Sequence, residues 1–285
     1  MVRKVRIPAN AQGILGFHYS CHYSHLARYA QLAGCEVEVV ERDTHVWCTL
    51  GGAPNFFSID VDGKQLIIDF SDLFREGLEN FSIFPAYGKY QYFYHECKQH
   101  AQLYPLGPPM DIRNDKLLYR YFELINKETI YTCNTDTVLN NQRAHTRALD
   151  RRTDVRNLLL RAEKYLDISL TTQWSFWSKF RNCLVSVVVP GACNNMVDRG
   201  HLEQLGLGVC TISPTLWTVF PYRQTLQPWI HYIPCKDDYT DLLDKIAWCR
   251  ENRNRCREIG KNAKEFFLHY YAPQKYWQWV EDILQ

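Results

Sequence analysis

One continuous apolar strand restricts the fold of this chain more than any other feature. The segment NCLVSVVVPG, residues 182–191, is apolar at almost every position and ends at Pro190 and Gly191. A strand with one solvated face alternates apolar and polar residues, whereas a strand buried on both faces of a parallel sheet is apolar throughout. The helical pattern MVDRGHLEQLG, residues 196–206, follows after a short loop. This order predicts a strand–helix unit within a parallel sheet.

The first third of the chain also alternates helix and strand patterns. The amphipathic segment SHLARYAQLAG ends at Gly34, a residue typical of helix C-termini, and the β-branched strand CEVEVVERD follows it. The segment FFSIDVDGKQLIIDFSD, residues 56–72, predicts two strands joined at Asp62-Gly63, because this dipeptide is a strong hairpin signal. The Pro/Gly-rich segment LYPLGPPMD then suggests a linker.

A second alternating unit begins near Lys127. The segment ETIYTCNTD, residues 128–136, predicts a strand that opens into a polar loop, and the following helical pattern over residues 140–165 is either one helix or two helices broken near Thr153. A loop follows the strand GVCTIS, a helical pattern follows the strand IHYIPC, and Pro273 separates the last two helices. We therefore expect an α/β fold with two doubly wound, Rossmann-like domains.

The length of 285 residues is comfortable for two domains of roughly 120 to 150 residues each. We expect an N-terminal domain over residues 1–125 and a C-terminal domain over residues 126–272. The terminal helix, residues 273–285, is expected to pack back on the N-terminal domain.

Composition excludes several classes of protein. With 46% hydrophobic and 22% charged residues, the chain is typical of globular proteins and not of disordered ones. Its 33 basic and 31 acidic residues give a formal net charge of +2, which argues against nucleic acid as a partner. No stretch of the sequence approaches the ~20 apolar residues of a membrane-spanning helix.

The cysteines and the N-terminal residues indicate the cellular compartment in which the protein is expected. The 11 cysteines include no CxxC motif and no regular spacing, so we expect buried free thiols and not a disulfide framework. The N-terminal segment MVRKVRIPAN carries basic residues without an apolar run after them, so we expect no secretory signal. These features predict a cytoplasmic protein.

Arg199 and Glu203 are the first candidates for a binding site. They lie four residues apart and therefore share one helix face, just beyond the predicted buried strand. Ligands of open α/β sheets bind beyond the carboxyl ends of the strands, where loops lead into helices. The sequence leaves two alternatives, which are a surface ion pair and a site for a diphosphate and a ribose. It contains neither GxGxxG nor GxxxxGK[ST], so a Rossmann dehydrogenase or a P-loop enzyme is not expected.

The order of landmarks from about Ser186 to Phe267 is distinctive. After the apolar strand, Gly191 and Arg199 come LGLGVCTISP, PYRQTLQPWIHYIPC, DDYTDLLDKIAWC and REIGKNAKEFF. This order resembles the C-terminal half of the protein O-glucosyl/O-xylosyltransferases and their fungal capsule-associated relatives, and L-x-P-W-x-H-Y-x-P is its most specific part. The exostosin-like transferases share part of the pattern. The resemblance implies a nucleotide-sugar glycosyltransferase of the GT-B type, with two domains and a central cleft. Glycosyltransferases of large algal viruses are also similar, which would place the chain in viral or host-cell cytoplasm.

The resemblance also implies which residues bind the sugar donor. Arg199 corresponds to the arginine that grips the donor diphosphate, and Gly191 and Asp198 flank it in the same donor-binding segment. Glu203 would accept hydrogen bonds from ribose hydroxyls, as in the exostosin-like pattern. A second phosphate contact is expected from Arg143, although an exposed arginine on a basic helix is an equal alternative. Tyr222 is expected to line the base or sugar pocket, with packing in the domain core as the alternative.

The catalytic base is expected in the N-terminal domain. The transfer needs a group that takes the proton of the acceptor hydroxyl. The resemblance points to Asp72, after the apolar strand of QLIIDFSDL, with Asp69 and His18 as alternatives; a strand-end aspartate also suits a helix cap. A zinc site at His18 and its neighbouring histidines lacks further ligands at suitable spacing. The DVD sequence at residues 60–62 fits a hairpin turn better than a metal motif. We therefore expect no obligatory metal and no cofactor beyond the donor substrate.

Together these features predict an inverting, metal-independent glycosyltransferase. The donor is expected to be a UDP-sugar carrying xylose or glucose, and the acceptor a hydroxyl group of a glycan or a protein. The alternative is a catalytically inactive protein of the same fold that binds nucleotide sugars or carbohydrates.

Overall fold

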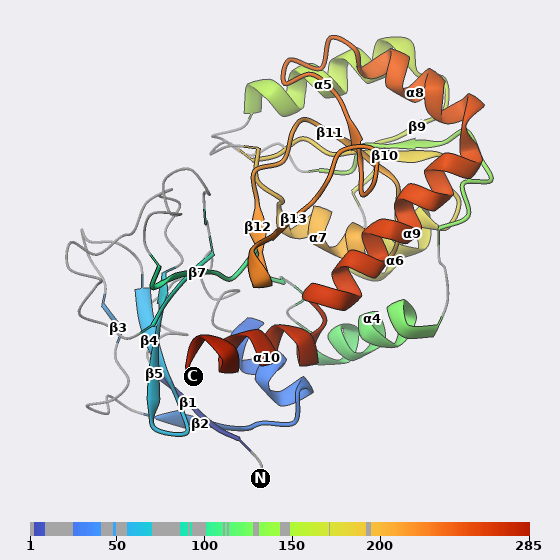
Figure 1. Cartoon of the computed structure of the whole chain (residues 1–285). Helices are drawn as coiled ribbons and strands as arrows, with labels where there is room; N and C mark the ends of the chain where they lie inside the picture. The colour runs from blue at the N-terminus through green and yellow to red at the C-terminus, as the bar shows by residue number, and fades with distance from the viewer. Residues whose placement is uncertain are drawn as a thin grey trace. The chain divides into compact units, whose positions relative to one another are not determined.

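The chain divides into two compact units (Figure 1). The computed structural model describes residues 3–8, 25–40, 48–49, 56–69, 86–90, 92, 101–110, 112, 114–127, 131–142, 149–170, 172–191 and 195–285. Unit 1 comprises Met1–Arg113, Thr218–Thr225 and His269–Gln285, and unit 2 comprises Asn114–Trp217 and Leu226–Leu268. Both units combine helices with parallel strands, so the chain has the predicted α/β class.

The division differs from the sequence-based domain boundaries in two places. Helix α4, Asp115–Lys127, contains the boundary expected at residue 125 but lies in unit 2. The hairpin of strands β12, Val219–Phe220, and β13, Gln224–Thr225, belongs to unit 1 although it comes from the middle of the C-terminal sequence. Helix α10, Pro273–Ile283, is also part of unit 1. There the Trp279 indole donates a hydrogen bond to the Pro105 carbonyl oxygen at 2.8 Å.

The sheet of unit 1 is mixed, whereas the sequence predicted a doubly wound, parallel arrangement. Its strands lie in the order β2-β1-β4-β5-β6-β7, and β3 also pairs with β4. These strands are β1, Lys4–Pro8; β2, Glu36–Val40; β3, Cys48–Thr49; β4, Phe56–Val61; β5, Lys64–Asp69; β6, Tyr87–Lys89; and β7, Leu103–Pro105. Strand β4 runs antiparallel to β1 and β5, while β5, β6 and β7 are parallel.

The Asp62-Gly63 turn explains the antiparallel strand. A two-residue connection joins only antiparallel neighbours, and both turn residues have left-handed backbone angles, φ 51° and 85°. The Asp60 carboxylate accepts a hydrogen bond from the Gly63 amide at 3.0 Å. The Asp62 carboxylate accepts one from the Lys4 amide at 2.8 Å and another from Arg3, and these bonds lower the pKa of Asp62. The predicted hairpin is confirmed, and both aspartates of the DVD sequence stabilise it.

The sheet of unit 2 is fully parallel among the described strands. Its order is β14-β11-β10-β8-β9, with every neighbouring pair parallel. The strands are β8, Val138–Leu139; β9, Leu166–Asp167; β10, Val185–Val187; β11, Thr211–Ser213; and β14, Ile233–Pro234. The predicted apolar strand forms β10 at the centre of this sheet. Its residues and the following Val188 and Val189 are all buried, which confirms the expectation drawn from their apolar character.

The helices of unit 2 lie before, between and after these strands in the chain (Figure 1). Besides α4 they are α5, Leu149–Ala162; α6, Gln173–Phe180; α7, Arg199–Gly206; α8, Leu242–Glu251; and α9, Arg253–Tyr270, whose last residues count with unit 1. Within the described part of the chain, no helix has the length and apolar character needed to cross a membrane. Helix α5 runs through Thr153, so of the two alternatives for this segment the structure excludes the break at Thr153.

The strand expected at the start of residues 128–136 falls partly outside the described residues, and the described residues 131–137 form no strand; the strand that follows them is β8 at Val138–Leu139. Cys133 has a left-handed φ of 55°, which no strand accommodates. The Arg253 guanidinium binds the carbonyl oxygens of Cys133 and Thr135, at 3.0 and 2.6 Å. A side chain therefore satisfies the polar groups that a sheet partner would otherwise bind.

Helix α9 approaches the segment before β11 very closely. A Cβ atom placed on Gly260 would lie 2.1 Å from the carbonyl oxygen of Gly208 and 3.2 Å from the amide nitrogen of Cys210. Backbone atoms cannot move aside as the end of a flexible side chain does, so only glycine fits at this position.

We expect Gly260→Ala to lower the free energy of unfolding by about 1–3 kcal/mol or more, because the methyl group overpacks the contact with Gly208. Thermal or urea denaturation measures this change. Lys261→Ala, at the exposed neighbouring position on α9, is the control and should stay within about 0.5 kcal/mol of wild type. Equal stability of the Gly260 variant and wild type would contradict the close approach.

Candidate functional site

The carboxyl ends of the unit 2 strands meet at one edge of the sheet, because the strands are parallel. Asn140, Asn141 and Gln142 follow β8, residues 188–191 follow β10, and Asp237, Asp238 and Tyr239 follow β14 by a short loop. Helices α5 and α7 begin after β8 and β10, so their first turns belong to the same edge. We refer to this region as the carboxyl edge of unit 2.

Asp198 organises the start of helix α7. It is the N-cap residue, in extended conformation, and its Oδ1 accepts a hydrogen bond from the His201 amide at 2.8 Å. Its Oδ2 accepts two further hydrogen bonds, from Gln142 Nε2 at 2.6 Å and from Arg152 Nη2 at 3.1 Å. The side chains of Arg152 and Asp198 are 13% and 26% exposed. One carboxylate thus joins α7 to α5 and to the segment after β8.

Gln142 and Arg152 also bind the segment after β10. The Val189 amide donates a hydrogen bond to Gln142 Oε1, and the Val189 carbonyl oxygen accepts one from Arg152 Nε at 3.1 Å. Arg156 of α5 donates a hydrogen bond to the Gln142 carbonyl oxygen. Side chains therefore fix the backbone of three connections at the carboxyl edge relative to one another.

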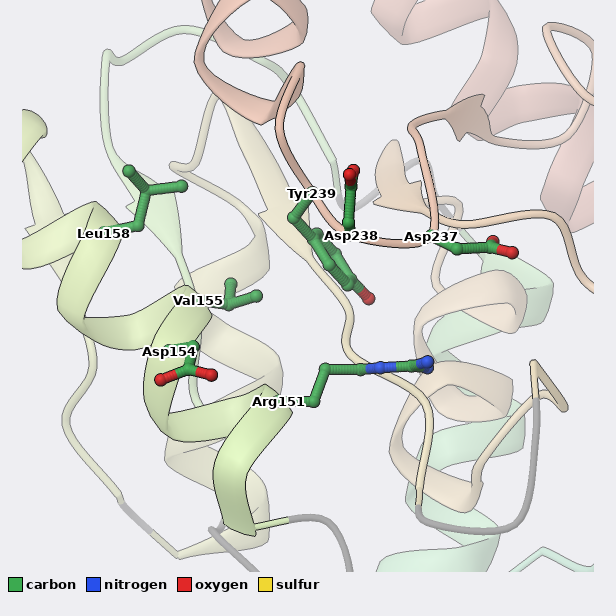
Figure 2. A pocket seen from close by; sticks show the side chains of 7 residues that line it. All are labelled: Arg151, Asp154, Val155, Leu158, Asp237, Asp238 and Tyr239. Carbon is green, nitrogen blue, oxygen red and sulfur yellow. The ribbon is translucent and has the colours of Figure 1, made fainter.

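A pocket of about 590 Å³ lies between the first turns of α5 and the segment after β14 (Figure 2). Its lining residues are Arg151, Asp154, Val155, Leu158, Asp237, Asp238 and Tyr239. Figure 2 shows Arg151 extending from α5 toward the side of the pocket that Asp237 and Tyr239 occupy. The lining combines apolar surface with three carboxylates and one guanidinium, so most of its charged side chains are hydrogen-bond acceptors.

Asn195 links the two sides of this pocket. Its Oδ1 accepts a hydrogen bond from Arg151 Nη1 at 3.2 Å, and its Nδ2 donates one to Asp237 Oδ1 at 2.9 Å. The Tyr239 hydroxyl donates a hydrogen bond to the Val188 carbonyl oxygen at 3.0 Å, and burial raises the pKa of this tyrosine. The pocket wall is therefore held by bonds to the same segment that follows β10.

Besides Asn141 Oδ1, two buried polar atoms at the carboxyl edge lack a hydrogen-bond partner among the described residues. They are Asn140 Oδ1, directly after β8, and Ser213 Oγ, at the end of β11. Both side chains are almost completely buried. Buried polar atoms without partners cost free energy, so a polar ligand or a water molecule at this edge would be stabilised by them.

The structure brings three of the predicted donor residues to this edge. Arg199 is the first residue of α7 and is partly exposed, directly after the cap residue Asp198. Gly191 lies two positions beyond Val189, and no described atom lies within 4 Å of the place where its Cβ would be. Space is therefore available beside the Gly191 backbone.

Glu203 lies deeper in unit 2. Its side chain is only 5% exposed, and its Oε2 accepts a hydrogen bond from the Trp177 indole of α6 at 2.6 Å. The Tyr121 hydroxyl of α4 donates to the Glu203 carbonyl oxygen at 2.9 Å. The carboxylate expected to bind a ribose thus has a partner within the protein.

Tyr222 belongs to unit 1 and not to the carboxyl edge of unit 2. It lies in the 3₁₀ turn Pro221–Arg223, with a left-handed φ of 57°. Its hydroxyl donates to the Lys275 carbonyl oxygen at 3.3 Å, and its ring centroid lies 4.9 Å from that of Trp279. Burial raises the pKa of its hydroxyl. The side chain packs on α10.

Asp69 is the only candidate base within the described residues. It ends β5, is fully buried, and accepts hydrogen bonds from the Tyr87 hydroxyl at 2.8 Å and from Lys89 Nζ at 3.1 Å. Lys89 is also fully buried. Asp72, His18 and Arg143 lie outside the described residues. In the part of the chain that the structure describes, no three His, Cys, Asp or Glu side chains are placed to hold a metal ion.

Sequence analysis did not identify Gln142, Arg151, Arg152, Asn195 or Asp237. Their roles come from contacts between segments far apart in the chain, which no local pattern records. The available signal was the pair Arg151 and Arg152, which lies in the first turn of a helix that follows a strand. An arginine at such a position lies at the carboxyl edge of the sheet.

His201 of α7 makes the stability of unit 2 dependent on pH. Burial lowers its pKa to about 4, and its Nε2 lies 3.1 Å from the Thr211 hydroxyl oxygen. Between pH 6.5 and pH 4 the unfolded chain binds a proton at this residue and the folded chain does not. We therefore expect stability to fall as the pH decreases through this range, by up to about 3 kcal/mol. His201→Gln should reduce the slope in urea denaturation between pH 7 and pH 4, and an unchanged slope would contradict the assignment.

The C-terminal part of the chain is similar in sequence to one group of known proteins. Residues 209–285 match the family described as Glycosyl transferase family 90. Uncharacterized protein 179R of Invertebrate iridescent virus 6 is 35% identical over 63 residues, which are 22% of this chain and 5% of that protein. Protein O-glucosyltransferase 3 of Homo sapiens is 30% identical over 64 residues, 22% of this chain and 13% of that protein.

A third relative is Protein O-glucosyltransferase 2 of Danio rerio, which is 42% identical over 45 residues, 16% of this chain and 9% of that protein. The chain therefore spans only a small part of the length of these relatives. Within those limits, residues 209–285, from the approach to β11 to the end of α10, are similar to glycosyltransferases of family 90.

Proposed function

We propose that the chain is a glycosyltransferase that moves a sugar from a UDP-sugar to a hydroxyl group of a glycan or a protein. The observation that carries this proposal is the match of residues 209–285 to glycosyl transferase family 90. The matched segment includes β11 and β14, two strands of the carboxyl edge. The names of the relatives specify glucose transfer to protein oxygen, so glucose is one candidate sugar and xylose is the other.

The proposed donor site is the carboxyl edge of unit 2. Arg199 at the start of α7 supplies a guanidinium whose planar fork suits phosphate oxygens. The helix N-terminus adds backbone N–H groups with a favourable dipole for the same anion. The open space beside Gly191 admits the diphosphate close to the backbone.

The adjacent pocket suits the hydroxyl-rich part of a donor. Its volume of about 590 Å³ is adequate for a nucleoside or a sugar ring. The carboxylates of Asp237 and Asp238 accept hydrogen bonds from hydroxyl groups, and the Arg151 guanidinium donates to carbonyl or phosphate oxygens. The unpartnered atoms at the same edge, which are Asn140 Oδ1, Asn141 Oδ1 and Ser213 Oγ, add further polar groups.

The proposed reaction is a single displacement with inversion. The acceptor oxygen attacks the anomeric carbon while the bond from that carbon to the diphosphate oxygen breaks, and a base removes the hydroxyl proton. Arg199 and the α7 N-terminus stabilise the negative charge that develops on the departing UDP. This scheme needs no obligatory metal ion, because positive groups of the protein supply the stabilisation.

Asp72 is the proposed base. Asp69 is buried against Lys89 and Tyr87, which leaves its carboxylate no exposed surface for an acceptor hydroxyl. Asp72 follows three residues later, beyond the end of β5. His18 remains the second candidate, because imidazole accepts protons near neutral pH.

A screen of UDP- and GDP-sugars tests the donor assignment. We expect UDP-sugars to raise the melting temperature of the wild-type chain, because a ligand that binds only the folded state stabilises it. Arg199→Ala should weaken UDP binding at least about tenfold, since it loses charged hydrogen bonds to phosphate. Lys261→Ala, an exposed cation of α9, is the control and should bind UDP normally. If no UDP-sugar stabilises the chain and Arg199→Ala binds UDP as wild type does, the proposal is wrong.

Asp72→Asn separates an enzyme from an inactive binding protein of the same fold. We expect transfer, or slow donor hydrolysis, to fall about 10²- to 10⁴-fold with UDP affinity retained, because the base is lost and the donor site is intact. Single-turnover assays with radiolabelled UDP-glucose and UDP-xylose measure this change. If the wild-type chain binds UDP without turnover, it is instead an inactive binding protein. If Asp72→Asn keeps full activity, Asp72 is not the base and His18 becomes the candidate.

A further inference from the structure

We propose that Arg152 is a positioning residue that prepares the start of α7 for an anionic ligand. It does so by neutralising the cap carboxylate of Asp198 and by holding the segment after β10 against it. This inference rests on the proposed function, since the anion is the diphosphate of the donor. Nothing in the sequence motifs assigns a role to Arg152, which emerges only from its contacts.

The first argument is geometric. Two different nitrogens of Arg152 bind two different segments, because Nε donates to the Val189 carbonyl oxygen at 3.1 Å and Nη2 donates to Asp198 Oδ2 at 3.1 Å. Val189 ends the apolar run after β10, and Asp198 starts the helix that follows. The guanidinium group of Arg152 therefore binds both ends of the connection between β10 and α7, which contains Gly191. A lysine has a single nitrogen and cannot reproduce this pair of bonds in the same geometry.

The second argument is electrostatic. Asp198 is needed as the cap, since its Oδ1 accepts the His201 amide hydrogen. Its negative charge, however, lies directly beside Arg199 and the N–H groups that would hold a diphosphate, and like charges repel. Arg152 places a positive charge at 3.1 Å from this carboxylate. The carboxylate can then cap the helix without cancelling its positive end.

Gln142 supports the same arrangement without adding charge. Its Nε2 donates to Asp198 Oδ2 at 2.6 Å, and its Oε1 accepts from the Val189 amide. It therefore repeats the connection that Arg152 makes between Val189 and Asp198. Because Gln142 continues to hold the two segments when Arg152 is replaced, the effect of the charge can be measured apart from a collapse of the loop.

The test compares equilibrium binding of UDP and of uridine to five proteins by calorimetry. These are the wild-type chain, Arg152→Met, Arg152→Lys, Asp198→Asn and the double variant Arg152→Met with Asp198→Asn. We expect Arg152→Met to weaken UDP binding about tenfold and uridine binding less than about twofold, because only UDP carries the diphosphate. Adding Asp198→Asn to Arg152→Met should restore most of the UDP affinity, since asparagine caps the helix without a charge.

Arg152→Lys isolates the positioning role. It keeps the positive charge but retains only one of the two contacts, so we expect UDP affinity between those of wild type and Arg152→Met. Arg250→Met is the matched control, because Arg250 pairs with Glu163 just beyond the far end of α5, in the same unit. Its UDP affinity should equal that of wild type. Far-ultraviolet circular dichroism confirms that each variant compared is folded.

The outcomes separate this inference from the proposed function. The proposed role of Arg152 is wrong if Arg199→Ala loses UDP affinity but Arg152→Met keeps it, or if Asp198→Asn fails to restore the affinity of Arg152→Met. In both cases the proposed donor site is retained. Equal losses for UDP and uridine would likewise overturn the electrostatic argument. If Arg199→Ala binds UDP as wild type does, the donor site itself is misplaced.

Discussion

The parallel alignment of the unit 2 strands is the constraint on which the candidate site depends. Because β8, β10, β11 and β14 run in one direction, the residues that follow them collect at a single edge. The Asp198 carboxylate then connects this edge, since it caps α7 and accepts hydrogen bonds from Gln142 and Arg152. Without the common strand direction these side chains would lie at opposite edges of the sheet.

The regular elements were largely predictable from local sequence, and for physical reasons. The apolar run around Val187 has few environments other than the centre of a parallel sheet, and Asp62-Gly63 adopts the backbone angles of a tight hairpin. Cys133 lies near the expected change from a strand to a polar loop, and its carbonyl oxygen is bound by Arg253 and not by a neighbouring strand. Strand β9 and helix α6 were missed because their polar and aromatic residues show no clean period of two or 3.6.

The candidate site was predictable only in part. Arg199, Asp198 and Gly191 could be found because they are close in sequence and follow a recognisable strand. Arg152 could not, because strands β9 and β10 and helix α6 lie in the chain between it and its two partners, Val189 and Asp198. Glu203 shares a helix face with Arg199 in the sequence, yet its carboxylate contacts Trp177 in the interior, since burial of an indole N–H requires an acceptor. The resemblance to family 90 covers the C-terminal residues and does not reach the N-terminal candidates for the base.

The discontinuous composition of unit 1 has a consequence for synthesis on the ribosome. Unit 1 takes in residues 218–225 and 269–285, whereas unit 2 ends at Leu268. Every residue of unit 2 is therefore translated before the last segment of unit 1, including the indole of Trp279 that binds the Pro105 carbonyl. Unit 2 begins later in the chain than unit 1, but its last residue is translated earlier. The N-terminal strands of the nascent chain therefore remain in an incomplete unit 1 until α10 has been translated.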